Sequence, residues 1–415
     1  MVAVLSSRAV HRMFTTRVEV HFYRCPMAVT PNHRTEPTAR RSVLRVTVLW
    51  LAVVLALLLL ISAVSVIGRG FRLLGDDRAH QLFAFAGNPF VGLAVGVLAT
   101  VIVQSSTTVT AIVVTAVGTG ALTVNESVPI IMGSNVGTTV TCTFVALGFV
   151  GAREEFRRAL MASTIHDFFN VLALVIFFPL ELIFHPLARI SGWLTDLLYG
   201  SSLPDPSNMN VIRWLTRPVV TLVVDVVGRI GTVYVGALLV VVVGIAMIFV
   251  AIRFLSRLLK VLMVGRARDA LMVAVDRGPL RAMLTGFGVT VMTQSSTVTN
   301  TILVPFVGTG AITPKQVYPV TLGANLGTTL TALLAAFAVT GSNAKTGLQT
   351  ALVHVVYNVA AVAVIFGIPF LRRIPLRCAA WLADRSVDSK RFLATYLVVV
   401  FIVLPMSVIL LSLVF

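Results

Sequence analysis

Long apolar runs alternate with short charged segments along the whole chain. Three of these runs contain no charged residue and are long enough to cross a bilayer as helices. Two further runs are interrupted, one by the acid Asp167 and the other, which has no formal charge, by His354. The uncharged runs cover 46–67, 231–252 and 392–415, and the interrupted runs cover 159–180 and 347–371. This pattern predicts several membrane-spanning helices.

Two other regions are apolar but differ from simple membrane spans. Between 79 and 152 the only Asp, Glu, Lys or Arg is Glu126, and between 282 and 344 it is Lys315. Both regions are rich in Gly, Ser and Thr. Each predicts two short apolar arms that meet at a polar QSS triplet, and then a longer helix interrupted near its middle.

These two regions are copies of each other. Aligned without a gap, residues 104–141 and 294–331 are identical at 19 of 38 positions. The sequence HDFFN, which begins at His166, matches HVVYN, which begins at His354. Internal duplication of this kind is typical of transporters that are built from inverted repeats.

The composition agrees with an integral membrane protein. Of 415 residues, 57% are hydrophobic and only 12% are charged, and the mean hydropathy is +0.95. A soluble protein has about 25% charged residues. The apolar runs are continuous rather than alternating, which favours helices over a transmembrane barrel. We therefore predict an all-α integral membrane protein in the cell membrane (inner or plasma membrane) that crosses it several times.

The net charge of +17 is concentrated between the apolar runs, so it predicts orientation and not a nucleic-acid partner. Segment 253–281 has seven basic and two acidic residues, segment 371–391 has six and two, and 183–230 has four and three. The positive-inside rule places the basic segments and the basic N-terminus in the cytoplasm. If both QSS hairpins re-enter the membrane, the two copies then face opposite sides.

The predicted organisation follows from these patterns. It consists of a disordered basic cytoplasmic tail (1–45), a first transmembrane repeat (46–182), an extracytoplasmic segment (183–230), a second transmembrane repeat (231–391) and a final transmembrane helix (392–415). Re-entrant hairpins are expected at 90–120 and 281–310, and broken transmembrane helices at 127–150 and 317–340.

The QSS tips suit an anion site. A hairpin that ends inside the membrane has backbone N–H groups at its tip, and helix N-termini carry partial positive charge. Hydroxyl groups add further donors, and neither apolar core contains a fixed cation. The neutral oxygens of the same region suit Na⁺. Asn135 and Asn325 are candidate sodium ligands because each lies between glycines, where a helix can unwind.

Other interpretations of these residues stay open. Helices rich in Ser and Thr also pack closely without any ligand. His166 with Asn170, and His354 with Asn358, can tie helices together or support a site. Asp167 is either a functional acid in the membrane or a structural partner of Arg157 or Arg158. The three cysteines are scattered and offer no metal-binding spacing, so we expect Na⁺ only, no transition metal and no cofactor.

At these residues the chain resembles the type II sodium/phosphate cotransporter family. The resemblance covers roughly 88–182 and 280–415 and includes both QSST sequences, IIMGSNVGTTVT at 130–141, GAREEFRRALMASTIHDFFN at 151–170 and YPVTLGANLGTTLTALLAA at 318–336. It implies two inverted repeats with re-entrant hairpins, and Na⁺-driven uptake of inorganic phosphate by alternating access at a site in the middle of the membrane.

The resemblance also implies site residues. Phosphate would be bound by Gln104, Ser105, Ser106, Ser295, Ser296 and Thr297. One sodium site would use Gln294, Ser295, Thr328 and Thr331, and the matching positions of the first repeat are Gln104, Ser105, Thr138 and Thr141. Asn135 and Asn325 join this sodium set, and His166, Asp167, Asn170, His354 and Asn358 are expected to support it.

The chain departs from the family at Ala152. Electrogenic members resemble one another in having Asp at this position, and electroneutral members have Gly. We therefore expect electroneutral transport, with enough Na⁺ to balance the charge of HPO₄²⁻. The alternatives are transport of sulfate, arsenate or a dicarboxylate, a passive anion channel, or a membrane enzyme. An enzyme is disfavoured because His166 and Asp167 are adjacent and face different sides of a helix.

Overall fold

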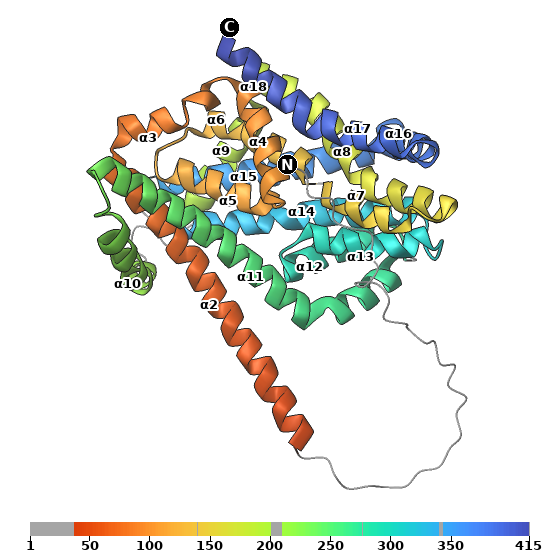
Figure 1. Cartoon of the computed structure of the whole chain (residues 1–415), viewed down its shortest axis with the longest axis horizontal. Helices are drawn as coiled ribbons and strands as arrows, with labels where there is room; N and C mark the ends of the chain where they lie inside the picture. The colour runs from red at the N-terminus through yellow and green to blue at the C-terminus, as the bar shows by residue number, and fades with distance from the viewer. Residues whose placement is uncertain (1–36, 139, 201–209, 276, 340–342, 415) are drawn as a thin grey trace. The chain divides into compact units, whose positions relative to one another are not determined.

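The computed structural model describes residues 37–138, 140–200, 210–275, 277–339 and 343–414, and all regular structure in these ranges is helical (Figure 1). Residues 46–415 form one compact unit, and the fold described below is that of this unit. Seven helical stretches in the described ranges are long and apolar enough to cross a membrane. They are Val46–Leu74, Val124–Phe149, Arg153–Phe184, Val233–Leu262, Pro314–Ala338, Ala344–Phe366 and Lys390–Val414. The predicted all-α membrane class is confirmed.

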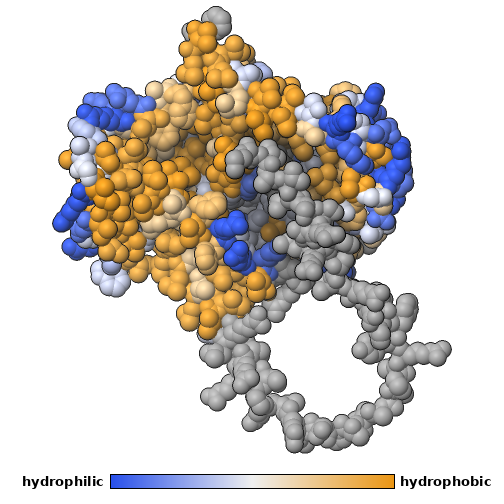
Figure 2. All heavy atoms as spheres, in the orientation of Figure 1, coloured by the Kyte–Doolittle hydropathy of each residue, from blue (hydrophilic) through white to orange (hydrophobic). Residues whose placement is uncertain are grey.

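Large apolar side chains are exposed in many of these helices. Leu55, Val175 and Leu413 have 65%, 63% and 78% of their surface accessible. Figure 2 shows apolar side chains over much of the visible face, with hydrophilic side chains gathered at its two lateral edges and in a smaller patch near its centre. A lipid environment explains this distribution, because the hydrocarbon core solvates apolar side chains and excludes charged ones.

Each QSS triplet joins two short helices into a hairpin. The first hairpin consists of α4 (Pro89–Val103) and α5 (Ser106–Gly118), and the second of α12 (Pro279–Thr293) and α13 (Ser296–Gly308). At 13 to 15 residues, these helices are about 20 Å long and too short to span a bilayer. Hairpins were predicted at these positions, and their depth in a membrane stays a prediction.

The two hairpins turn in the same way. Gln104 and Gln294 end α4 and α12 with left-handed backbone conformations, at φ 57° and 51°. The next residue caps the second arm: Ser105 Oγ accepts a hydrogen bond from the backbone N–H of Thr108, and Ser295 Oγ accepts one from Val298. A left-handed glutamine is uncommon, so its recurrence at both tips shows that the duplication extends to backbone geometry.

The helices that follow the hairpins differ between the copies. In the first copy, α6 (Val124–Gly137) ends and α7 (Val140–Ala146) begins at the expected interruption. In the second, α14 (Pro314–Ala338) continues without a break through the glycines where an interruption was predicted. The prediction of a broken helix at 317–340 is therefore wrong. The helical hydrogen bonds persist there, and the hydroxyls of Thr328 and Thr329 bond to carbonyls three residues earlier.

Close helix packing explains the glycines better than unwinding does. The first hairpin arm of each copy packs along the following helix, α4 on α6 and α12 on α14. A Cβ atom at Gly133 would overlap the carbonyl oxygen of Leu93, and one at Gly323 would overlap that of Met283. These contacts are equivalent under the internal repeat. Small residues four apart allow this kind of backbone approach between membrane helices.

The second arm of each hairpin packs against the other copy. The helix α5 packs on α14 and α15 (Ala344–Ala361), whereas α13 packs on α7 and α8 (Arg153–Phe184). At the ends of these arms, a Cβ at Gly347 would lie 3.2 Å from Gly118 Cα, and Arg158 Nε donates to Gly308 O at 3.0 Å. The hairpins thereby interlock the two copies.

Further helices surround this core. The helices α2 (Pro37–Leu74) and α11 (Val233–Val275) pack together through Ile67, Val241 and their neighbours. The remaining long helices are α9 (Pro186–Gly200), α10 (Asn210–Val227), α16 (Pro369–Asp388), α17 (Lys390–Val398) and α18 (Leu404–Val414). The segment predicted to connect the repeats at 183–230 therefore contains two helices.

The N-terminal prediction needs one correction. The helix α2 begins at Pro37, so residues 37–45 are helical although they were predicted as part of a disordered tail. Residues 1–36 lie outside the described part of the chain.

Candidate transport site

The two hairpin tips meet in one cavity of about 200 Å³. All six residues predicted to bind phosphate line it, and they come from both copies of the repeat. These residues are Gln104, Ser105, Ser106, Ser295, Ser296 and Thr297. Two sequence segments 190 positions apart thus contribute equivalent atoms to one polar space.

The N-termini of α5 and α13 lie at this cavity. Ser106 and Ser296 are the first residues of these helices, and both are buried. Free N–H groups and the helix dipole favour negative charge at such a position. At the first tip, Ser105 Oγ lies 3.0 Å from Thr107 Oγ1 and 2.8 Å from Thr108 Oγ1. Backbone and hydroxyl donors are therefore concentrated in a confined space.

The second tip is tied to α14 through two of the predicted sodium ligands. Thr331 Oγ1 donates a hydrogen bond of 2.6 Å to Gln294 Oε1, while Gln294 Nε2 donates one of 2.7 Å to Val291 O. Thr328 lies one turn before Thr331 and is buried, and its hydroxyl donates to Asn325 O. The structure thus brings Gln294 and Thr331 into contact, and the place of Thr328 in a sodium site stays a prediction.

In the first copy, the equivalent positions are described only in part. Thr138 lines the tip cavity, and its hydroxyl donates to Ser134 O at 3.0 Å. The side chain of Thr141, which was predicted as the counterpart of Thr331, lies outside the described side chains. A second sodium site therefore stays a prediction.

Four buried asparagines join the copies at another place. Asn325 Nδ2 lies 3.1 Å from Asn170 Oδ1 and 2.7 Å from Asn358 Oδ1. Asn135 Nδ2 donates to Asn358 Oδ1 at 3.3 Å, and His354 Nε2 donates to Asn135 Oδ1 at 3.0 Å. Asn170 Nδ2 also donates to Asn135 O at 2.8 Å. This network connects α6, α8, α14 and α15.

This network favours a connecting role for Asn170, His354 and Asn358. The described lining of the tip cavity contains neither Asn135 nor Asn325. Their predicted role as sodium ligands stays a prediction, and their observed contacts are to other side chains. Buried amides that satisfy one another hold helices in a fixed register.

His166 and Asp167 lie on α8 and are buried in the protein. The arginines considered as partners for Asp167 bond to other groups. Arg157 Nε donates to Asp384 Oδ1 at 2.5 Å, and Arg158 Nε donates to Gly308 O. These contacts hold α8 to α16 and α13, and the role of Asp167 stays a prediction.

The sequence analysis missed one wall of the cavity. The helix α11 contributes Phe249, Ile252, Arg253 and Ser256. Arg253 is exposed, with its guanidinium 6.0 Å from the centre of the Phe249 ring, and Ser256 Oγ donates to Gln294 O at 3.3 Å. These positions recur at helical spacing on one face. This spacing is the sequence signal that distinguishes Arg253 from the other basic residues of its segment.

Comparison with known proteins agrees with the duplicated architecture. The family model described as Na⁺/Pi-cotransporter matches residues 59–192 and 247–372, which include both tips. The chain is 31% identical to human sodium-dependent phosphate transport protein 2B over 451 residues, covering 85% of this chain and 64% of that protein. No solved structure matches the chain.

A second relative gives the same picture. The chain is 31% identical to mouse sodium-dependent phosphate transport protein 2A over 418 residues, covering 84% of this chain and 65% of that protein. It thus spans slightly less than two thirds of these relatives. Both are named as transport proteins. The chain belongs to the Na⁺/Pi-cotransporter family, a family of membrane transporters rather than enzymes.

Proposed function

We propose that this protein imports inorganic phosphate together with Na⁺. The proposal rests above all on the meeting of both QSS tips in one polar cavity. The relatives are named for sodium-dependent phosphate transport, which specifies the ions. A duplicated site of this kind suits a substrate that must be reached from both sides of a membrane.

Phosphate would bind between the two tips. Backbone N–H groups at the starts of α5 and α13 would bond to its oxygens, and Ser106 and Ser296 would add hydroxyl donors from opposite copies. Arg253 would supply positive charge at the wall formed by α11. Neutral donors hold an oxyanion while allowing release, and a single exposed cation raises its local concentration.

Sodium would bind where Thr331 meets Gln294. Their oxygens, with those of Ser295 and Thr328, form the kind of neutral ligand set that Na⁺ takes in transporters. The ion would replace the hydrogen bond from Thr331 to Gln294 by accepting both oxygens as ligands. Because the same tip carries Ser295 and Ser296, a cation there would stabilise a divalent anion in the adjoining cavity. This proximity is the proposed origin of coupling.

Transport would occur by alternating access, with two inverted repeats and re-entrant hairpins. The short hairpin arms support re-entry, because they cannot span the bilayer on their own. The two basic segments approach each other at one further cavity, where the uncharged Val275 and Pro279 come from the first segment and Arg372 comes from the second. Their proximity supports placing both segments on one side, which the positive-inside rule assigns to the cytoplasm together with the N-terminus.

The test is uptake of radiolabelled phosphate into proteoliposomes that contain the purified full chain. An inward Na⁺ gradient should drive accumulation, and an equal K⁺ gradient should not. Equal uptake in both gradients would overturn the coupling. Excess unlabelled sulfate, arsenate or dicarboxylate, added in parallel, tests the alternative oxyanions. If one of them competes more strongly than unlabelled phosphate does, that anion and not phosphate is the preferred substrate.

A further inference from the structure

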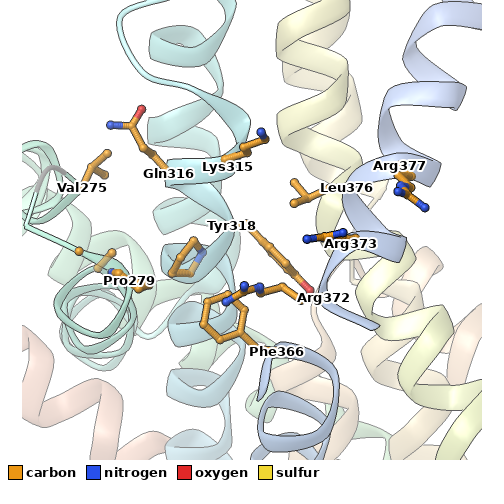
Figure 3. Close-up of a pocket in the computed structure, with 13 residues that line it drawn as sticks. Val275, Pro279, Lys315, Gln316, Tyr318, Phe366, Arg372, Arg373, Leu376 and Arg377 are labelled. Atoms are coloured by element: carbon orange, nitrogen blue, oxygen red, sulfur yellow. The ribbon is translucent and has the colours of Figure 1, made fainter. Parts of the chain in front are cut away.

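A second and larger cavity lies away from the hairpin tips. Its volume is about 870 Å³, and its walls come from the first turns of α12 and α14, from α16, and from the helical segment η4 (Val362–Phe366). The residues that line it are shown in Figure 3. None of them lines the tip cavity, so this space is separate from the proposed transport site.

The charge of this cavity has one sign. Its described lining contains Lys315, Arg372, Arg373 and Arg377 and no acidic side chain. The ion pairs found in the described part of the chain involve other residues and leave these four cations without a carboxylate. Three arginines and a lysine around one hollow attract an anion, and no carboxylate of the described lining balances their charge.

A buried hydroxyl provides an independent observation. Tyr318 lines the same cavity and is only 1% exposed, and its hydroxyl has no hydrogen-bond partner in the described structure. Figure 3 shows the hydroxyl end of Tyr318 directed toward Arg372. A buried hydroxyl without a partner is unfavourable unless a ligand or water satisfies it. This donor adjoins the cationic cluster, where an oxyanion would accept its hydrogen.

The remaining walls are apolar. Phe366, Leu376 and Pro319 lie beside the cations, and the Arg372 guanidinium is 5.3 Å from the centre of the Phe366 ring. The candidate membrane spans Pro314–Ala338 and Ala344–Phe366 begin and end at this cavity. It therefore has an apolar part and a cationic part at the end of two spans, which is the level of lipid headgroups.

We propose that this cavity binds a phosphate-bearing anion. Arginine guanidinium groups bond to phosphate oxygens in pairs, lysine adds a point charge, and the Tyr318 hydroxyl donates to one further oxygen. The same chemistry is offered by the headgroup of an anionic phospholipid and by free inorganic phosphate. Either ligand would connect α12, α14 and α16. The helix α12 ends at Gln294 of the second tip, and α14 carries its partner Thr331.

Binding to the purified, delipidated full chain tests the proposal in two arms, neither of which requires transport activity. The first arm adds phosphatidylglycerol or phosphatidylcholine and measures bound lipid by native mass spectrometry. The second titrates inorganic phosphate in K⁺ buffer without Na⁺, where the proposed transport site lacks its coupling ion. In both arms the wild type is compared with R372Q/R373Q, Tyr318→Phe and the control R385Q/R391Q. The control removes the same charge from α16 and α17, at residues outside the cavity lining.

We expect R372Q/R373Q to weaken the binding of one of the two ligands by roughly tenfold or more. The control R385Q/R391Q should leave that binding unchanged. Loss of phosphatidylglycerol binding identifies a lipid headgroup, and loss of phosphate binding identifies free phosphate. Tyr318→Phe should weaken binding of the same ligand by a smaller factor, since it removes only the hydroxyl. If the double variant does not fold, the result for Tyr318→Phe decides the question. Wild-type binding of both ligands by the cavity variants, or equal weakening by the control, would overturn the proposal.

Discussion

Thr331 on α14 donates a hydrogen bond of 2.6 Å to the side-chain oxygen of Gln294 at the second hairpin tip. In the sequence, the whole of α13 and the first two thirds of α14 lie between these two residues. Gln294 is also the residue with a left-handed backbone at which the hairpin reverses. A change in the contacts of this pair would therefore reach both the tip cavity and α14, as the coupling of an ion to an anion requires.

Replacing Thr331 with Val should weaken Na⁺ dependence. Valine has nearly the shape of threonine but no hydroxyl, so it removes one oxygen ligand and leaves Gln294 Oε1 without its observed donor. We expect the apparent Na⁺ constant for phosphate uptake to rise roughly fivefold, as for one lost hydrogen-bonding group. Uptake rates across a Na⁺ series at saturating phosphate measure this.

Thr350→Val is the matched control for that variant. Thr350 is also a buried helical threonine, and its hydroxyl bonds only to Thr346 O on its own helix. Its apparent Na⁺ constant should stay near that of the wild type. If Thr331→Val behaves like Thr350→Val, the predicted sodium site does not include Thr331.

Arg253→Gln should weaken phosphate capture. Arg253 is the one cationic side chain in the described lining of the tip cavity, so its charge should raise the local phosphate concentration. We expect the apparent phosphate constant to rise several-fold and to depend less on ionic strength, because salt screens the interaction that the variant lacks. Initial uptake rates at low and high ionic strength give both values.

Arg257→Gln tests whether charge anywhere on α11 has the same effect. Arg257 is exposed, lies one turn further along α11 and is not part of the described cavity lining. If both variants change the apparent phosphate constant equally, Arg253 acts only through the general surface charge.

Ser106→Ala and Ser296→Ala should each raise the apparent phosphate constant. The two serines begin α5 and α13 at the cavity, and each substitution removes one hydroxyl donor while the backbone N–H groups stay. A several-fold effect from each variant is expected, whereas Ser407→Ala on α18, an exposed position, should have none. Wild-type constants in both tip variants would exclude these hydroxyls from the site.

Electroneutral transport can be tested by voltage clamp. Ala152 is the N-terminal capping residue of α8 and has no side chain able to cap it or bind a cation. We expect phosphate and a Na⁺ gradient to evoke no current in a membrane that takes up phosphate. Ala152→Asp adds a carboxylate at the position where the resemblance implies an aspartate in electrogenic members of the family. A phosphate-evoked current in the wild type would contradict electroneutral transport.

The tips could be predicted from sequence because duplication marked them. Gln104 and Gln294 occupy equivalent positions in a gapless alignment, and both copies fold into hairpins that end there. Arg253 could not be found from the duplication, since α11 lies outside the aligned segments 104–141 and 294–331. Its helical spacing marks a face of α11, but only the fold shows that this face lies against the tips. Spatial proximity between distant elements is not encoded in local patterns.

The glycines around Asn325 were misinterpreted for a related reason. Glycine favours both unwinding and close helix contact, and the sequence does not distinguish these roles. The deciding fact is the backbone of α12, which lies against Gly323 and Gly327. The identity of this neighbour is a property of the fold.

Gly323→Ala should therefore destabilise the protein. The added Cβ would overlap backbone atoms of Met283 and Phe287, which cannot move aside as a flexible side chain does. Separating α12 from α14 would also move Gln294 away from Thr331. Overpacking of this kind typically costs about 1–3 kcal/mol. Thermal unfolding of the detergent-solubilised chain should show a lower midpoint than that of the wild type, with weaker Na⁺-dependent uptake.

Gly288→Ala provides the matched control on the facing helix. A Cβ at Gly288 meets no atom within 4 Å, and alanine has a higher helix propensity than glycine by about 1 kcal/mol. Its unfolding midpoint should equal or exceed that of the wild type. The close-packing interpretation requires opposite behaviour of the two substitutions, because both replace a helical glycine and only one of them faces a neighbouring backbone. Equal midpoints in the two variants would show that Gly323 is not needed for packing, and unwinding at this glycine would again be the better explanation.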